Sequence, residues 1–318
     1  MYSRRQFGAM ALSGAAVSAL SHSALWGAPL DSTDHGVKLG LITGTLNPLA
    51  EVPGKDSIDV IIAQCIEVGA ANIELVTVGG DTGPQVTGGG RFGQPPAEVT
   101  PAYLQSRDEQ RQWRIRMPLD RFRDVRRKFD AAGLNLFSYV WTVGDDWTDP
   151  EIDAGFRQLQ ALGVRLFCTN QTRMSMAPRL VPFAEKYGIR PAWHCHANVQ
   201  DPNEVATPES MEKLLAMSKA FVINFDIGHY TAGSNDALAF LKKHHDRITH
   251  LHVKDRKRDQ GPNVQLGTGD TPIVACLQAI RDNKWPIYAL LEREYRGPGT
   301  PVEEAKWQMG YMKKALSS

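Results

Sequence analysis

Five of the nine histidines lie at the ends of apolar segments in the second half of the chain: His194, His196, His229, His250 and His252. In the stretch PAWHCHANV, residues 191–199, the first two are two positions apart. Side chains at i and i+2 on a strand point to the same face, so both imidazoles would project together. Neighbouring imidazoles at the end of a buried strand are suited to binding a metal ion or to moving protons.

Three carboxylates interrupt apolar segments in a similar way. Asp226 lies near the end of AFVINFDI, Glu292 lies within IYALLERE, and Glu74 stands between Ile73 and Leu75. A carboxylate inside a buried strand is costly unless it is paired with a positive charge or bound to a metal. We therefore expect each of these side chains to have such a partner.

The elements that must position these residues alternate along the chain. Strand-like segments cover 37–43, 72–76, 134–141, 164–169, 189–195, 220–227, 248–254 and 287–294, and helical patterns cover 56–69, 119–132, 150–162, 178–187, 208–218, 235–245, 271–283 and 301–316. This alternation is typical of βαβ units and a parallel sheet. Eight units over about 290 residues predict an α/β fold, a single-domain (β/α)₈ TIM barrel over 29–318. An open doubly wound sheet is the alternative, but no Gly-x-Gly-x-x-Gly follows the first strand, so a dinucleotide-binding fold has no support.

In such a barrel, the segment THLHVKD, residues 249–255, assigns its polar side chains to the lumen. Leu251 and Val253 share one face, which packs against the helices, while His250, His252 and Lys254 share the other. Active sites of these barrels form where the carboxyl ends of the strands meet.

Four residues from consecutive strands would converge at that end: His194, Asp226, His252 and Glu292. Two neutral imidazoles and two carboxylates balance the charge of one divalent cation. These ligands favour Mn²⁺ first, with Co²⁺, Fe²⁺, Zn²⁺ or Mg²⁺ as alternatives, and disfavour Ca²⁺. Taken singly, a histidine at a strand end is also typical of a hydrogen-bonded core residue, and an aspartate there of a helix cap.

The beginning of the chain has a different character. The stretch MYSRRQFGAMALSGAAVSALSHSALWGAP combines Arg4 and Arg5 with Phe7 and a mildly apolar run rich in Ala, Gly and Ser. This pattern predicts a twin-arginine export signal over 1–28, and hence a periplasmic or otherwise exported protein. The four cysteines lie in apolar helix-like or strand-like segments without a pairing pattern, so we expect buried free thiols.

Composition restricts the partners of the protein. The 318 residues are 42% hydrophobic and carry a formal net charge of +1. This balance gives no reason to expect nucleic acid as a partner, and no apolar run after the signal is long enough to span a membrane. A homo-oligomer is compatible with the sequence. The Gly- and Pro-rich stretch 78–117 is interpreted as a lid or substrate-facing loop, with a flexible insertion as the alternative and Arg91 and Arg107 as candidate substrate contacts.

Several motifs resemble those of the xylose isomerase-like TIM barrels, a superfamily that includes sugar isomerases, ketose 3-epimerases, inosose dehydratases and endonuclease IV. They are IEL at 73–75, DIGH at 226–229, HLHVKD at 250–255, GTGD at 267–270 and LLE at 290–292. The resemblance covers essentially the whole chain after the export signal. It implies an enzyme that uses one divalent metal ion and acts on a small carbohydrate.

The resemblance also implies individual ligands. In the epimerase branch the metal is held by Glu, Asp, His and Glu from strands 5 to 8, and the last three match Asp226, His252 and Glu292. On strand 5 the Glu-Asn-His of the family becomes His-Cys-His, so His194 replaces the glutamate and His196 matches the family histidine.

This replacement bears on the reaction. In the epimerases two glutamates exchange protons on opposite faces of an enediolate, while the metal stabilises the oxyanion. Glu292 remains as a base, and the candidates for a second one are Glu74, Glu294, Lys254 and His196. An isomerase or epimerase acting on a sugar or keto-sugar is therefore the first expectation. A metal-dependent lyase or dehydratase, acting by β-elimination on a keto-sugar or 3-keto-glycoside, is the alternative.

Other side chains at this end have expected roles as well. His229 matches a family histidine that contacts substrate oxygens, and Glu294 is grouped with His196 and His229 as substrate-binding. Lys254 is a candidate donor to a developing oxyanion or leaving oxygen, with a salt bridge to Asp255 or Asp226 as the alternative.

Two further function classes are less well supported. A DNA-repair endonuclease of this superfamily needs a three-metal cluster with histidines on early strands, and no histidine occurs between His35 and His194. A non-catalytic periplasmic sugar-binding or partner subunit would not need Asp226, His252 and Glu292 together.

Overall fold

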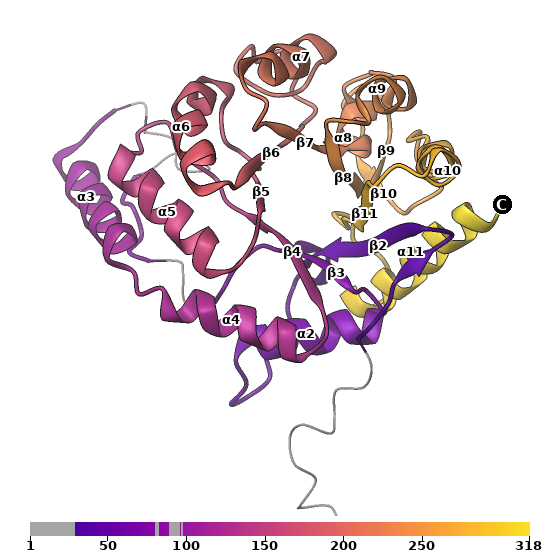
Figure 1. Cartoon of the computed structure of the whole chain (residues 1–318), viewed down its shortest axis with the longest axis horizontal. Coiled ribbons are helices and arrows are strands. Elements are labelled where there is room, and N and C mark those ends of the chain that lie inside the picture. Colours follow the sequence, from indigo (N-terminus) through magenta and orange to yellow (C-terminus); the bar gives the residue numbers. More distant parts are fainter. Residues whose placement is uncertain (1–28, 80–82, 89–95, 97) are drawn as a thin grey trace, which may run out of the picture.

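The computed structural model describes residues 29–318 except 80–82, 89–95 and 97. Within these residues, eight parallel strands form a closed barrel with helices around it (Figure 1). This confirms the predicted (β/α)₈ architecture. The predicted export signal and Arg91 lie outside the described residues.

The barrel strands follow the predicted order along the chain. They are β2 (Val37–Ile42), β3 (Asn72–Leu75), β4 (Asn135–Val140), β5 (Leu166–Cys168), β6 (Arg190–His194), β7 (Val222–Asp226), β8 (Ile248–Val253) and β11 (Tyr288–Leu291). Around the barrel they are arranged β2-β11-β8-β7-β6-β5-β4-β3, and pairing between β2 and β3 closes the sheet. The predicted eighth strand was too long, because β11 ends before Glu292.

Eight helices match the predicted helical segments to within two residues at each end. They are α2 (Ser57–Val68), α4 (Asp120–Ala131), α5 (Asp149–Ala161), α6 (Ala177–Tyr187), α7 (Pro208–Met217), α9 (Ala237–His244), α10 (Ile273–Asn283) and α11 (Pro301–Ser317). The helix starts are capped, since the side chains of Asp56, Thr207 and Thr300 accept hydrogen bonds from backbone N–H groups of α2, α7 and α11. Gly69 and Gly188 end α2 and α6 in the left-handed conformation that favours glycine.

Among the described residues, five strands and α-helices were not predicted. They are β1 (Thr33–Asp34), α3 (Pro101–Arg116), α8 (Ile227–Ala232), β9 (Asp255–Arg256) and β10 (Asn263–Val264). β1 forms a hairpin with β2, and β9 pairs with β10 in a small ribbon. The interpretation of 78–117 as one loop is therefore wrong for 101–116, which is a helix of four turns.

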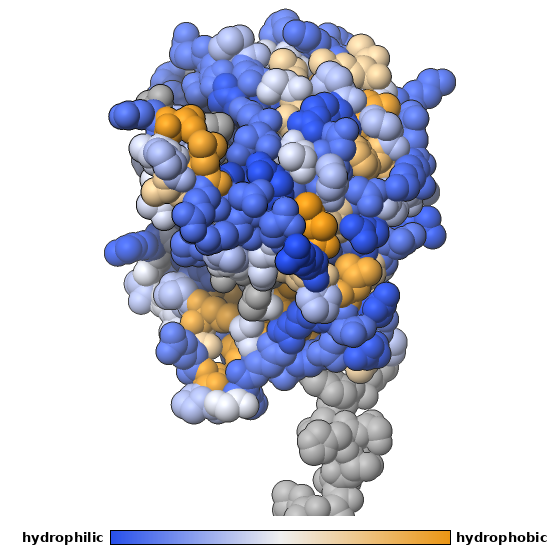
Figure 2. Space-filling model, turned by 90° about the vertical axis from the view of Figure 1, so that its left-hand side faces the viewer, coloured by the Kyte–Doolittle hydropathy of each residue, from blue (hydrophilic) through white to orange (hydrophobic). Residues whose placement is uncertain are grey.

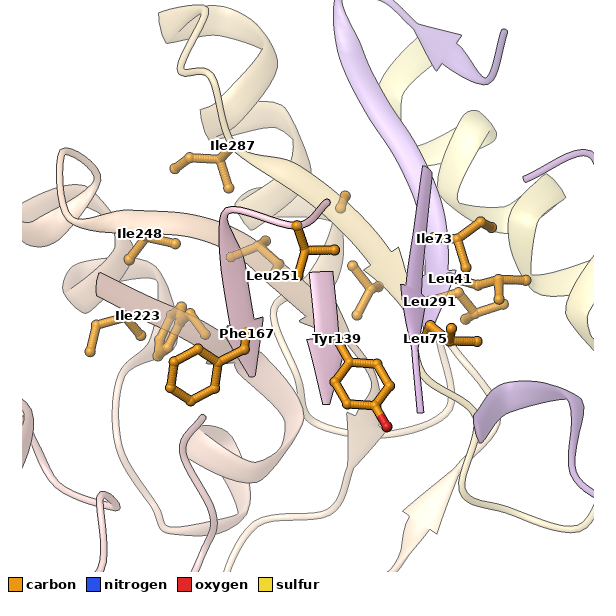
Figure 3. Close-up of a cluster of buried hydrophobic side chains, with 14 of the residues drawn as sticks. Leu41, Ile73, Leu75, Tyr139, Phe167, Ile223, Ile248, Leu251, Ile287 and Leu291 are labelled. Carbon is orange, nitrogen blue, oxygen red and sulfur yellow. The ribbon is translucent and has the colours of Figure 1, made fainter. Parts of the chain in front are cut away.

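Alternation along the strands separates an apolar layer from a polar lumen. Ile73 and Leu75 of β3 and Leu251 of β8 belong to the buried hydrophobic cluster between the strands and the helices (Figure 3). Glu74, between the first two, forms a hydrogen bond with His250, although β11 and β2 separate β8 from β3 in the sheet. The polar side chains of β3 and β8 therefore meet inside the barrel, as the parity of THLHVKD predicted.

Helix α3 is attached to α5 by charge. Arg107, Arg111 and Arg114 share one face of α3 and lie 2.9, 3.0 and 3.2 Å from the carboxylate of Glu151, near the start of α5. Arg107 is also paired with Asp146, and its side chain is only 6% exposed. The structure thus places Arg107 in a structural ion-pair network, not against a substrate.

The outer surface on the side of α3 and α5 is mainly hydrophilic, with small separate hydrophobic areas (Figure 2). No helix in the described part of the chain is long and apolar enough to cross a membrane. All four cysteines lie in that part and are buried free thiols, as predicted.

Candidate active site

Four of the predicted ligands come together at the carboxyl end of the barrel. His194 ends β6, Asp226 ends β7, His252 lies near the end of β8, and Glu292 directly follows β11. Each offers one ligand atom such that all four atoms lie within 4.8 Å of one another. Neighbouring strands are aligned to allow this, since Asp226 is opposite His252 in the β7–β8 register.

Asp226 serves two purposes with its two oxygens. Its Oδ1 accepts a hydrogen bond of 2.6 Å from the backbone N–H of His229 and so caps α8. Its Oδ2 faces the cluster, 4.0 Å from Nε2 of His194. Both sequence-based interpretations of this aspartate, helix cap and cluster member, therefore hold at once.

Each of the four residues carries a buried polar atom without a hydrogen-bond partner among the described residues. These atoms are Nδ1 of His194, Oδ2 of Asp226, Nδ1 of His252 and Oε2 of Glu292. Nδ1 of His252 and Oε2 of Glu292 are 2.9 Å apart, but their relative orientation is not that of a hydrogen bond. Buried polar atoms without hydrogen bonds are rare, although the two carboxylate oxygens here are ion-paired with Lys254. A set of two imidazoles and two carboxylates suits a divalent cation. The residues fit the predicted metal.

The charge of this region also suits a divalent cation. The carboxylates of Glu74, Asp226 and Glu292 are opposed by the ammonium group of Lys254, with Nζ 3.1 Å from both Asp226 Oδ2 and Glu292 Oε2. When the histidines are neutral, two negative charges remain uncompensated. Burial raises the pKa of Asp226 to about 6, which is the expected effect of a site that lacks enough positive charge.

Lys254 does not line the cavity described below. Its side chain is 2% exposed, and its Nζ also lies 2.8 Å from Glu294 Oε2 and 2.9 Å from His229 Nε2. Although burial alone lowers the pKa of Lys254, Asp226 and Glu292 raise it. Of the two predicted interpretations, these distances describe the salt bridge with Asp226. The alternative partner, Asp255, instead accepts hydrogen bonds from the backbone of the GTGD turn.

Below the cluster, Glu74 joins two histidines of β8. Its Oε1 is 2.8 Å from Nε2 of His252, its Oε2 is 3.1 Å from Nε2 of His250, and its side chain is fully buried. Burial lowers the pKa of His252, but Glu292 and Glu74 outweigh it and raise the pKa to about 10. Without a bound cation, His252 is therefore an imidazolium between two carboxylates.

A cavity of about 310 Å³ lies over the cluster. Its polar wall comprises Cys168, Asn170, Gln171, His194, His196, His229, His252, Glu292 and Glu294, and its apolar wall comprises Ile42, Gly44, Val76 and Val140. No lysine or arginine among the described residues lines it. The cavity is large enough for a monosaccharide and lies at the low end of the volumes of ligand sites.

The predicted substrate-binding residues all reach this cavity. His196 follows β6 and its Nε2 lies 3.1 Å from Nε2 of Gln171. The Nδ1 of His229 accepts a hydrogen bond of 2.7 Å from Arg256. Burial, followed by the charge of Lys254, holds the pKa of His229 well below its usual value, so this imidazole is neutral.

Sequence reasoning missed Asn170, Gln171, Arg256 and the partners of Asp255. The carboxylate of Asp255 accepts hydrogen bonds from the N–H groups of Gly267, Gly269 and Thr271, and so fixes the GTGD turn beside β9. The sequence held signals for them, because TNQT stands at the end of the fourth predicted strand and both HLHVKD and GTGD belong to the quoted motifs.

Comparisons with known proteins agree with this architecture. Residues 173–315 match the family described as xylose isomerase-like TIM barrel. An inosose dehydratase of Lactiplantibacillus plantarum is 32% identical over 153 residues, 42% of this chain and 50% of that protein. An inosose dehydratase of Clostridium perfringens is 26% identical over 157 residues, 43% and 51% of the two chains. The chain thus spans about half the length of these relatives.

The fold resembles solved structures over most of its length. A D-psicose 3-epimerase of Clostridium cellulolyticum H10, determined with D-tagatose, superposes with a TM-score of 0.60 at 11% identity. The superposition covers 88% of this chain and 99% of the epimerase. At this identity the likeness concerns the fold.

Proposed function

We propose that the chain, whose residues 173–315 match the xylose isomerase-like TIM barrel family, is a divalent-metal-dependent enzyme that moves a proton beside the carbonyl group of a sugar or keto-sugar. The observation that carries this proposal is the convergence of His194, Asp226, His252 and Glu292 beside the cavity, which all of them except Asp226 line. These residues would hold the ion. When bound, a divalent cation polarises a carbonyl oxygen and makes the neighbouring C–H bond more acidic.

The candidate bases differ in their access to a substrate. Glu292 and Glu294 both line the cavity and follow β11, whereas Glu74 and Lys254 lie behind its wall. His196 also lines the cavity, beyond the end of β6, three strands away from β11 around the barrel. We assign proton abstraction to Glu292, which has Glu294 as its neighbour on the same side of the cavity. We assign the return of the proton to His196, on the side of β6.

The walls favour an uncharged carbohydrate. A phosphorylated sugar would need basic side chains to balance its charge. The cavity wall, as far as the structure describes it, instead offers two carboxylates, imidazoles and amides. These groups exchange hydrogen bonds with hydroxyls, and the apolar wall formed by Ile42, Val76 and Val140 suits the C–H face of a sugar ring.

Isomerisation or epimerisation is the first candidate reaction. Glu292 takes a proton from the carbon beside the carbonyl, an enediolate forms, and a proton is returned to a carbon or oxygen of the same molecule. No bond between heavy atoms breaks. His196 can return the proton from the face opposite to Glu292, as epimerisation requires.

Elimination is the second candidate, and two observations favour it. Carboxylates line the cavity only near β11 among the described residues, and the two relatives named above are inosose dehydratases. In this reaction Glu292 takes the same proton, the electron pair forms a C=C bond, and the bond to the β-oxygen breaks. His196 then protonates the leaving oxygen, which departs as water or an alcohol.

The proposal is tested by metal analysis of the purified protein and by NMR of candidate sugars, keto-sugars and 3-keto-glycosides in D₂O with Mn²⁺. We expect bound metal and solvent deuterium beside the carbonyl of the substrate. A new sugar indicates isomerisation or epimerisation, and an unsaturated ketone or a released alcohol indicates elimination. A protein that takes up no Mn²⁺ would overturn the proposal.

A further inference from the structure

The carboxylate of Glu74 lies where no substrate can reach it. Its side chain is 0% exposed, and it extends from β3 across the lumen to β8. Its oxygens contact residues 176 and 178 positions away in the sequence. A group sealed in this way cannot exchange protons with a sugar in the cavity. It does, however, touch one of the four residues of the cluster directly.

The two contacts of Glu74 fix which nitrogen of His252 is free. A carboxylate only accepts hydrogen bonds, so an imidazole nitrogen at 2.8 Å from Oε1 must donate. In neutral His252 the proton is then on Nε2, and Nδ1 is bare. That Nδ1 faces the cluster and makes no hydrogen bond, because Oε2 of Glu292 lies 2.9 Å from it without hydrogen-bond geometry. Only a bare nitrogen can bind a metal ion.

The other oxygen of Glu74 is occupied by Nε2 of His250, so Oε1 is left to His252 alone. Nδ1 of His250 lies 2.9 Å from the hydroxyl of Thr249, which can donate to it. Asn224 directs its Nδ2 both to Sγ of Cys168 and to Nε2 of His252, at 3.2 and 3.1 Å, while its Oδ1 has no partner in the described structure. The amide agrees with this tautomer when it is turned by 180°, which brings Oδ1 to the N–H of His252.

We propose that Glu74 is a positioning residue: it holds the proton of His252 on Nε2 and so presents Nδ1 to the metal ion. This inference rests on the proposed metal-dependent function. Carboxylates that orient metal-binding histidines in this way typically contribute 10- to 100-fold in metal affinity.

The test compares three variants by titration with Mn²⁺ in a calorimeter. Glu74→Gln keeps the shape of the side chain but offers only one acceptor oxygen to two imidazoles, so we expect a 10- to 100-fold loss of Mn²⁺ affinity. His250→Gln is the matched control, because it changes the other buried partner of Glu74 and keeps the contact between Glu74 and His252. We expect its affinity to stay within about threefold of that of the unchanged protein, well short of that loss. His252→Gln should lose affinity at least as strongly as Glu74→Gln.

A second measurement needs no variant that folds poorly. In the unchanged protein loaded with diamagnetic Zn²⁺, ¹⁵N–¹H correlation spectra of the imidazoles should show the proton of His252 on Nε2. A proton on Nδ1, or undiminished Mn²⁺ affinity of Glu74→Gln while His252→Gln loses it, would overturn the role of Glu74 and leave the metal site standing. Absence of Mn²⁺ and Zn²⁺ binding to the unchanged protein would overturn the proposed function itself.

Discussion

Lys254 places a single positive charge among three carboxylates at the candidate site. Its Nζ is 3.1 Å from Asp226 and from Glu292 and 2.8 Å from Glu294. Removing one partner of a buried ion pair leaves the others uncompensated, which typically costs about 3–5 kcal/mol. A divalent cation bound to two of these carboxylates can offset the loss. A bound metal ion and Lys254 would thus neutralise the same carboxylates.

This balance predicts the behaviour of Lys254→Met. Without metal, we expect the variant to be less stable by about 3 kcal/mol. With saturating Mn²⁺, its melting temperature should rise by more than that of the unchanged protein, because the ligands no longer face a competing ammonium group. Thermal unfolding with and without Mn²⁺ measures both effects. Lys128→Met is the control, since Lys128 pairs with Asp56 and Asp59 far from the cavity wall. Equal Mn²⁺-induced shifts in both variants would contradict the prediction.

His194 is the residue at which the chain departs from the epimerase pattern. It is 4% exposed and lines the cavity. His194→Glu restores a carboxylate that can both bind the ion and accept a proton, and proton-transfer groups of this kind contribute about 10²–10⁴-fold. We expect deuterium exchange from D₂O into a turned-over substrate, followed by NMR, to increase at least about tenfold. His194→Gln adds no base and should show no increase. Equal rates for the two variants would show that the imidazole does not suppress a second base.

At the scale of elements, α3 is attached to the barrel by ion pairs instead of by an apolar face. Arg107, Arg111 and Arg114 converge on the carboxylate of Glu151, which is buried. Arg114 also stacks over the ring of Trp147, with 4.1 Å between its Cζ and the ring centroid. The position of this helix therefore depends mainly on the charge of Glu151, with Asp146 as a second partner of Arg107.

The same contact gives a pH dependence. Burial raises the pKa of Glu151, but hydrogen bonds and charge from Arg107 and Arg111 outweigh it, so the pKa lies below its usual value. The stabilisation is therefore complete above the usual glutamate pKa of about 4.3 and is lost as the pH falls through the lower pKa of the folded protein.

We expect Glu151→Gln to lower the free energy of unfolding by about 3 kcal/mol at pH 7, and by less at pH 3. Urea unfolding at both pH values measures this difference. Glu67→Gln provides the control, because the pair of Glu67 with Lys306 is exposed and should contribute at most about 1 kcal/mol. A loss for Glu151→Gln that does not change with pH would contradict the ion-pair explanation.

Most regular elements were predictable because their apolar residues repeat with the period of a strand or a helix. Helix α3 was not, since only Tyr103, Ser106 and Arg107 are buried in it and its sequence contains few apolar residues. The four cluster residues were predictable from their position at strand ends. The alternation of side chains along the strands places Lys254 and Glu74 in the lumen of the barrel. It does not say how far a side chain lies from the cavity, so it could not show that both lie behind the cavity wall. The contact between Glu74 and His252 depends on closure of the barrel across strands that are distant in sequence.

At the scale of the whole molecule, we propose that the first 28 residues direct export by the twin-arginine pathway. The pathway requires both arginines of the motif, so replacing Arg4 and Arg5 together by lysine should retain most of the protein in the cytoplasm. Fractionation of cells that produce the two forms, followed by immunoblotting, measures the exported share. Arg116→Lys, at an exposed position in α3, is the control. Unchanged export of the double variant would exclude this route.

The two walls of the cavity come from different halves of the chain. All four cluster residues lie within 173–315, the part that matches the family, whereas Ile42, Gly44, Val76 and Val140 come from β2, β3 and β4 or directly follow them. The cluster and the apolar wall of the cavity are thereby encoded in separate segments, and Glu74 of β3 is a contact between them. Under the proposed function, point changes at the four apolar positions would reshape the cavity without replacing a ligand or Glu74. The barrel would in this respect allow its specificity to change separately from its metal site.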